Sequence, residues 1–245
     1  MISLLLNINA PARAKFLIAI GYVVALLAAI ILHELGHGFA AYISGDYTAK
    51  MRGRLSLNPI KHLDPIGTLM MVIVGFGWAK PVPIDPRNFK DYKKGMLLTS
   101  LAGVLVNLLL AFISAGVMAL FLLCVKDLNW NIVYNGEYSA GNYVYTFVTY
   151  LCMFSMLFNL SLMAFNILPI FPLDGFRVVE TLAKPNNKYV DFMYKYGQFV
   201  LFGLLILSSV LGRINSNLDI FSLYINTIRN AMLKLFELIF HISIF

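Results

Sequence analysis

Residues 16–37 read FLIAIGYVVALLAAIILHELGH, and this stretch bears on both the fold and the chemistry of the chain. It carries no charged residue from Phe16 to Leu32. A helix that crosses a bilayer needs a run of about 20 mostly apolar residues, so a membrane span is predicted here. The run ends in the motif HELGH at residues 33–37, which places ionisable side chains at one end of the predicted span.

The composition of the whole chain also indicates a membrane protein. Of its 245 residues, 60% are apolar and 13% are charged, and the mean hydropathy is +0.77. An ordinary soluble domain is about 45–50% apolar and about 25% charged. The composition therefore excludes a disordered chain, a nucleic-acid-binding module and an ordinary soluble enzyme. No nucleic-acid partner is expected, although the net charge is +7.

The remaining charge-free stretches outline the fold. They are Pro65–Ala79, Gly95–Val125, Tyr138–Leu173 and Tyr196–Gly212. The first of these is short and glycine-rich, so it is interpreted as re-entrant or interfacial rather than spanning. Residues 214–245 are expected to form a C-terminal hydrophobic helix with Arg229, Lys234 and Glu237 set into it, which either spans the membrane or lies on it. The prediction is one all-α polytopic membrane domain over residues 1–245, with about 4–6 transmembrane helices.

The basic residues predict the orientation of this domain. They concentrate between Gly45 and Gly95 and again after Leu173, whereas the loop from Lys126 to Glu137 holds one; the two concentrations are Lys50, Arg52, Arg54, Lys61, Lys80, Arg87, Lys90, Lys93 and Lys94, and Arg177, Lys184, Lys188 and Lys195. By the positive-inside rule both concentrations face the cytoplasm. We therefore expect a multi-pass protein of the plasma membrane with its N-terminus outside.

Residues 45–95 are predicted to form a strand and re-entrant region on the cytoplasmic side. Met51–Asn58 alternates apolar or small residues with polar ones, which is typical of a strand. Ala79–Ile84 contains Pro81 and Pro83, so it is expected to be extended rather than helical. The alternative is that both stretches are ordered connecting loops.

The HELGH motif is an HExxH sequence, which predicts a metal site. On a helix, residues four apart lie about 40° from one another, so His33 and His37 offer two imidazoles to one ion beside Glu34. Imidazole nitrogen suits zinc, and a catalytic zinc takes three protein ligands and leaves one position open. Charged groups in a membrane span are costly, about 2.5–3.5 kcal/mol each at the centre, which disfavours a chance occurrence.

Asp174 is the candidate third ligand. It follows the charge-free run Tyr138–Leu173, which by the predicted topology ends at the same side of the membrane as His33. Pro169 and Pro172 prevent a regular helix there, and Gly175 permits a turn, so the carboxylate is carried by broken backbone. The alternative is that Asp174 only caps a following helix.

With these motifs in place, the chain resembles the site-2 protease family of intramembrane zinc metalloproteases. HExxH on a core span, followed far downstream by NxxPxxxLDG (residues 166–175), carries the resemblance, and residues 58–67 and 77–83 add to it. The resemblance implies that His33, His37 and Asp174 hold one catalytic zinc and that Glu34 is the base. Many relatives carry PDZ or CBS domains, for which 245 residues leave no space. This chain therefore resembles the minimal core-only subgroup.

Five further residues match the family or are candidates of other kinds. Gly103 and Asn107 match a family span whose asparagine faces the active site, although the proline usual after that glycine is Val104 here. Asn107 and Asn166 are expected either to cross-link helices or to bind substrate or oxyanion. By the hypothesis of strand addition, the strand at Met51–Asn58 or the extended Ala79–Ile84 holds an unwound substrate, and Leu55 is then a candidate substrate contact. His62, beside Asp64, competes as a zinc ligand but is more simply explained as pinning a loop.

These observations predict a zinc-dependent endopeptidase that cuts within or next to transmembrane segments, with a membrane protein or peptide as substrate and the lipid bilayer as partner. One alternative is a transporter or channel, since polar residues in spans also line ion paths. The other is an inactive zinc-binding scaffold for single-span proteins. The sequence makes no prediction of the oligomeric state.

Overall fold

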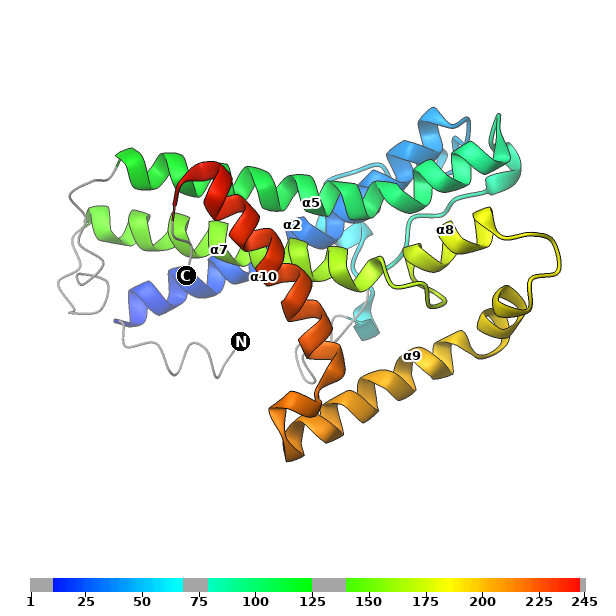
Figure 1. Ribbon diagram of the computed structural model, residues 1–245. Helices are drawn as coiled ribbons and strands as arrows, with labels where there is room; N and C mark the ends of the chain where they lie inside the picture. Colours follow the sequence, from blue (N-terminus) through cyan, green and yellow to red (C-terminus); the bar gives the residue numbers. More distant parts are fainter. Residues whose placement is uncertain (1–10, 68–78, 125–139, 243–245) are drawn as a thin grey trace.

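The computed structural model describes residues 11–67, 79–124 and 140–242, and these residues are organised as helices and loops (Figure 1). Three long helices, α2 (Ala12–Ile43), α5 (Tyr92–Cys124) and α7 (Ala140–Asn166), lie side by side with alternating direction. The helices α8 (Asp174–Leu182), α9 (Lys188–Ile214) and α10 (Ile220–Phe240) follow. Short helical turns occupy the connections: α3 (Thr48–Met51), η1 (Pro59–Lys61), η2 (Pro86–Asn88) and η3 (Ser216–Leu218).

Four helices among the described residues are long and apolar enough to cross a membrane. They cover Ala12–Ile43, Tyr92–Cys124, Tyr143–Asn166 and Lys188–Ile214. This confirms the predicted all-α polytopic class. The first span is longer than the charge-free run that predicted it, because the helix continues through the HELGH motif to Ile43. The third is shorter, because α7 ends at Asn166, ahead of Pro169, and a proline disfavours helix in the residues before it.

Small side chains let the three long helices approach one another. Ala25 and Ala29 of α2 are buried, and Ala111 and Ala115 of α5 are fully buried. Small residues at helix contacts are the rule inside membranes, where packing rather than water exclusion drives helix association. The main apolar cluster joins α5, α7 and α10 through Ala111, Met156, Leu160 and Phe236.

The C-terminal helix α10 packs obliquely across α5 and α7 (Figure 1). Its Leu233 and Phe236 are buried in the main cluster. α10 is not among the four candidate spans, and it carries Arg229, Lys234 and Glu237. Helix α9 lies at an angle to the three-helix bundle and is joined to α10 through Ser208, whose hydroxyl bonds Asp219 at the start of that helix.

The predicted strand at Met51–Asn58 is wrong. Met51 ends the short helix α3, and Gly53 turns the chain with a φ of +61°, in the left-handed region that favours glycine. Asn58 then caps η1 by accepting a hydrogen bond from the Ile60 amide. The alternation that predicted a strand belongs to an irregular loop. Ala79–Ile84 is non-helical, as its prolines predict.

Most of the predicted re-entrant stretch, residues 68–78, lies outside the described residues. Its two flanks lie together, because Leu63 and Ala79 form an isolated antiparallel bridge and the Lys80 amide donates to the His62 carbonyl at 2.8 Å. The residues on either side of this stretch, Leu63 and Ala79, are therefore neighbours in space.

Candidate metal centre

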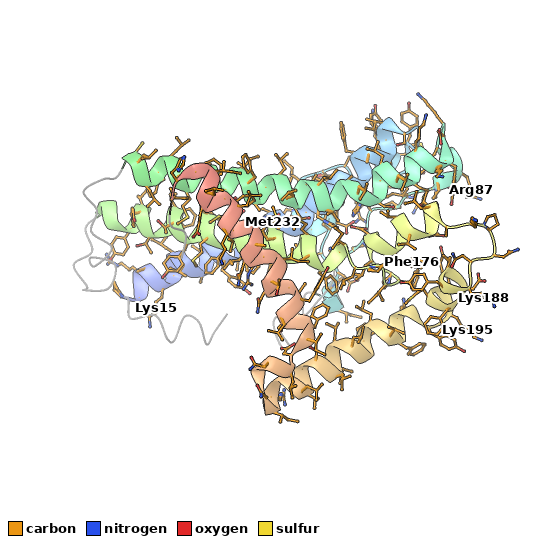
Figure 2. All side chains as sticks on the ribbon, in the orientation of Figure 1. Lys15, Arg87, Phe176, Lys188, Lys195 and Met232 are labelled. Atoms are coloured by element: carbon orange, nitrogen blue, oxygen red, sulfur yellow. The ribbon has the colours of Figure 1, made fainter. Side chains whose placement is uncertain are left out.

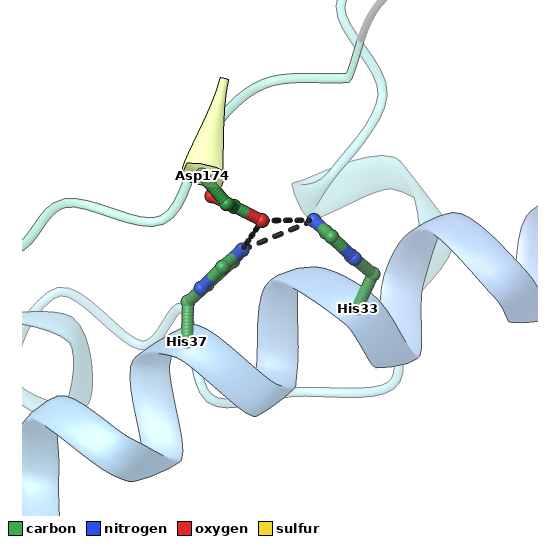
Figure 3. A group of neighbouring side chains, drawn as sticks. All are labelled: His33, His37 and Asp174. Carbon is green, nitrogen blue, oxygen red and sulfur yellow. Dashed lines mark hydrogen bonds and ion pairs between the residues drawn. The ribbon is translucent and has the colours of Figure 1, made fainter. Parts of the chain in front are cut away.

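Three side chains distant in the sequence converge at one buried point. Figure 3 shows His33 and His37 projecting from one face of α2 toward Asp174, the first residue of α8. Their candidate ligand atoms all lie within 4.8 Å of one another. Both histidines are buried, with only 8% of each residue exposed. The spacing of four residues on one helix therefore brings the two imidazoles together, as the HExxH pattern predicted.

The separations of these atoms match those around a tetrahedral zinc. His33 Nε2 and His37 Nε2 are 3.0 Å apart, and Asp174 Oδ2 lies 3.4 Å from the first and 3.2 Å from the second. With metal–ligand bonds of about 2.0–2.1 Å, ligand atoms at tetrahedral corners are separated by about 3.3 Å. The three residues fit a single small ion.

The hydrogen bonds behind the site show why a cation fits it. His37 Nδ1 lies 2.7 Å from the carbonyl oxygen of Thr99, which only accepts, so Nδ1 carries the hydrogen and, in the neutral imidazole, Nε2 presents a lone pair. That lone pair faces Asp174 Oδ2, which is buried and accepts no hydrogen bond from the described residues. Two acceptors in contact repel each other unless a positive charge lies between them, which a metal ion supplies.

Broken backbone delivers Asp174 to the histidines, as predicted. Gly175 packs against the end of α7 so closely that a Cβ built there would lie 2.1 Å from the Ile167 carbonyl oxygen. Leu173, not Asp174, is the N-cap residue of α8, and no side chain caps that end. The capping explanation for Asp174 is therefore not what the structure shows.

Glu34 lies beside the metal ligands on α2 and contacts the loop opposite. Its Oε2 accepts a hydrogen bond from the Val82 amide at 2.9 Å. Pro81 and Pro83 have no N–H, so Val82 provides the only backbone donor of these three residues and Glu34 uses it. This bond fixes one carboxylate oxygen. Because this amide is already used, Ala79–Ile84 has few backbone N–H groups left to pair with a substrate strand. These contacts therefore do not favour the strand-addition hypothesis.

The predicted substrate contacts occupy different surroundings. Asn107 is fully buried behind His33, with both ends of its amide hydrogen-bonded, which favours the helix cross-linking interpretation. Asn166 donates to the Leu162 carbonyl of its own helix. Leu55 packs on α2, since a Cβ built on Gly38 would lie 2.7 Å from Leu55 Cδ2. A substrate role for these residues stays a prediction. His62 is buried and bonds the Ser56 carbonyl oxygen at 2.7 Å, consistent with pinning a loop.

Asp46 is a residue that the sequence reasoning missed. It is fully buried after α2, and its carboxylate accepts hydrogen bonds from the Thr48 amide and hydroxyl, the Asn88 side chain and the Asp85 amide. Burial raises its pKa, but these hydrogen bonds outweigh burial and hold the pKa below its ordinary value of 3.8. Asp46 thereby ties the end of α2 to the loop that carries Val82. The local signal was an acidic residue two positions before a threonine, a typical turn pattern.

The variant Asp46→Asn is expected to lower the free energy of unfolding by about 1–3 kcal/mol at pH 7, since an amide NH2 would meet the Asp85 amide donor. A group with a depressed pKa stabilises above its unfolded pKa and loses that contribution as the pH falls through the folded pKa. Thermal unfolding in detergent at pH 7 and below pH 3.8 measures this. The difference from the parent should shrink at low pH. The exposed Asp191→Asn is the control, and equal effects of both variants would contradict the prediction.

The fold and the site together define a class. HExxH on one of four candidate spans among the described residues, completed by an aspartate from broken backbone, fits a membrane-embedded zinc metalloprotease. Residues 21–206 match the model of Peptidase family M50, and the chain belongs to this family of site-2 proteases.

Curated relatives agree with this assignment. The chain is 38% identical over 223 residues to YwhC of Bacillus subtilis, named as a proposed zinc metalloprotease, with 89% of this chain and 91% of that protein covered. It is 25% identical to Rip2 of Mycolicibacterium smegmatis, named likewise, over 76% of this chain and 66% of the relative. Rip2 of Mycobacterium tuberculosis is 29% identical over 74% of this chain and 63% of that protein. No solved structure matches. The protein is thus a zinc metalloprotease, as the sequence predicted, rather than a transporter.

Proposed function

We propose that this zinc metalloprotease is an intramembrane endopeptidase, which hydrolyses peptide bonds within or next to transmembrane segments of membrane proteins. In this proposal His33, His37 and Asp174 are the metal ligands and Glu34 is the catalytic base. The family membership supports the peptidase chemistry. The position of the site along α2 supports the intramembrane location.

That position is the observation that carries the proposal. Exposed apolar side chains occur on α2 both before the motif, at Val23 and Val24, and after it, at Phe39 and Ile43, where they are 60% and 52% exposed. The helix has 32 residues and is about 48 Å long, more than the roughly 30 Å of hydrocarbon. Apolar side chains this exposed are suited to lipid contact, so the histidines lie within the apolar length of the helix.

The residues of the site divide the chemistry between them. A zinc ion held by the two histidines and Asp174 would supply a Lewis acid that acidifies water and polarises a carbonyl group. Glu34 takes a proton from the attacking water on Oε1, while the Val82 amide holds Oε2. Glu34 then returns the proton to the leaving amine. The carbonyls of a substrate helix are hydrogen-bonded, so the substrate must unwind locally before attack.

The proposed orientation places the site toward the cytoplasm, in the plasma membrane. In Figure 2, Arg87, Lys188 and Lys195 lie at the end of the molecule near α8, whereas Lys15 lies at the opposite end. The first three belong to the regions rich in basic residues, which the positive-inside rule assigns to the cytoplasmic face. Asp174 begins α8, the helix near which these three residues lie.

The test is cleavage of a single-span protein co-reconstituted with the purified enzyme in lipid vesicles. We expect a cut inside the apolar segment, in its cytoplasmic half, located by mass spectrometry of both fragments. A soluble protein without an apolar segment is the control substrate. Efficient cleavage of the soluble protein, with the membrane substrate left intact, would contradict the intramembrane proposal.

A further inference from the structure

A chain of polar side chains leads from the metal site into the space between α5 and α7. His33 Nδ1 lies 2.5 Å from Asn107 Oδ1, Asn107 Nδ2 donates to Asn159 Oδ1 at 2.9 Å, and Asn159 Nδ2 donates to the Ser155 carbonyl oxygen at 2.8 Å. Asn107 is 0% exposed and Asn159 is 1% exposed. Two buried amides inside spans cost free energy unless their groups are hydrogen-bonded, so the presence of these two calls for an explanation.

The donors and acceptors along these side chains can be assigned, starting from the hydrogen bond between Asn159 and Ser155. A backbone carbonyl only accepts, so the Asn159 group that faces Ser155 is the NH2 and the group that faces Asn107 is the oxygen. Asn107 must then present its NH2 to Asn159 and its oxygen to His33. His33 Nδ1 consequently carries the hydrogen. In the neutral imidazole Nε2, which lies 3.4 Å from Asp174 Oδ2, is left with its lone pair.

We infer that Asn159 is a positioning residue, which holds His33 in the tautomer that binds metal. His37 needs no such positioning residue, because the backbone carbonyl of Thr99 accepts directly from its Nδ1. His33 is held by an amide, and an amide turned end for end would offer NH2 instead of oxygen. Asn159 removes that freedom by pairing with Asn107. The inference rests on the proposed role of His33 as a ligand.

Removal of Asn159 should weaken metal binding without a change in any ligand. Asn107 would then be free to present its NH2 to His33, which favours the tautomer with the hydrogen on Nε2, the atom that metal needs. Hydrogen-bond partners behind metal ligands are commonly worth about 10–100-fold in metal affinity. We expect a loss of zinc affinity in this range for Asn159→Leu and for Asn159→Ala.

The experiment compares zinc affinities by competition with a fluorescent chelator, on detergent-purified variants whose helical content matches the parent. Thr149→Val is the matched control, since Thr149 is buried on the same helix, ten residues or about 15 Å earlier. The control should bind zinc as the parent does. Parental affinity in the Asn159 variants, or an equal loss in the control, would overturn the inference.

A second measurement uses the parent protein and needs no variant to fold. Nitrogen-15 NMR of labelled histidine in the metal-free protein reports which ring nitrogen carries the hydrogen. Hydrogen on His33 Nδ1 is expected, whereas a bare Nδ1 with hydrogen on Nε2 would overturn the inference. Failure of the proposed function would give a different result, because the parent protein itself would then bind no zinc or cut no membrane substrate.

Discussion

Glu34→Gln is expected to lower the rate of peptide cleavage by about 10²–10⁴-fold, the usual contribution of a positioned general base. An amide cannot take a proton from water at neutral pH, so the step assigned to Glu34 is lost. The substitution keeps the size of the side chain and an oxygen that accepts from the Val82 amide. Geometry is therefore preserved while basicity is removed.

Zinc content separates this effect from damage to the site. Because Glu34 is not one of the three converging ligands, the variant should hold zinc at the parental stoichiometry. Cleavage of the vesicle-embedded substrate and zinc analysis of the same preparation are the measurements. Glu237→Gln, the same substitution on α10, serves as the control. A Glu34→Gln variant that cuts as fast as the parent would refute the role of Glu34.

The metal site was predictable where its geometry is local. Two histidines four residues apart on a helix must share a face, so the sequence alone predicted that His33 and His37 meet. Asp174 is distant, but its prolines and Gly175 indicated broken backbone at the right end of a span, and the family pattern pointed to the same residue. The structure then brings Asp174 to within 3.4 Å of both imidazoles.

What could not be predicted depends on long-range partners. Asn159 looks like any polar residue in an apolar helix until α5 places Asn107 against it. Asp46 acquires its role only when the loop at Asp85 folds back 39 residues later. The strand at Met51–Asn58 failed for a local reason: a short alternation fits a surface loop as well as a strand, and Gly53 turns the chain.

The packing of α5 against the site makes a second prediction of large effect. Gly103 faces both imidazoles, and a Cβ built on it would lie 2.4 Å from His37 Nε2 and 2.6 Å from His33 Cε1. The helices α2 and α5 are closely packed beside this point, since a Cβ built on Gly36 would lie 3.2 Å from the Ala102 carbonyl oxygen, so a retreat of α5 would give up this contact. The extra methyl of Gly103→Ala therefore displaces the imidazoles from the positions that match zinc.

Gly103→Ala is thus expected to lose zinc affinity by about 100-fold or more, beyond the usual effect of residues behind the ligands. Cleavage should fall with it, and excess zinc should restore part of it. Chelator competition and the zinc dependence of cleavage measure this. Gly203→Ala on α9 is the matched control, because no atom lies within 4 Å of its built Cβ. Glu34→Gln should keep zinc and lose activity, whereas Gly103→Ala should lose both; parental zinc affinity in Gly103→Ala would show that the imidazoles do not bind the ion in the arrangement described.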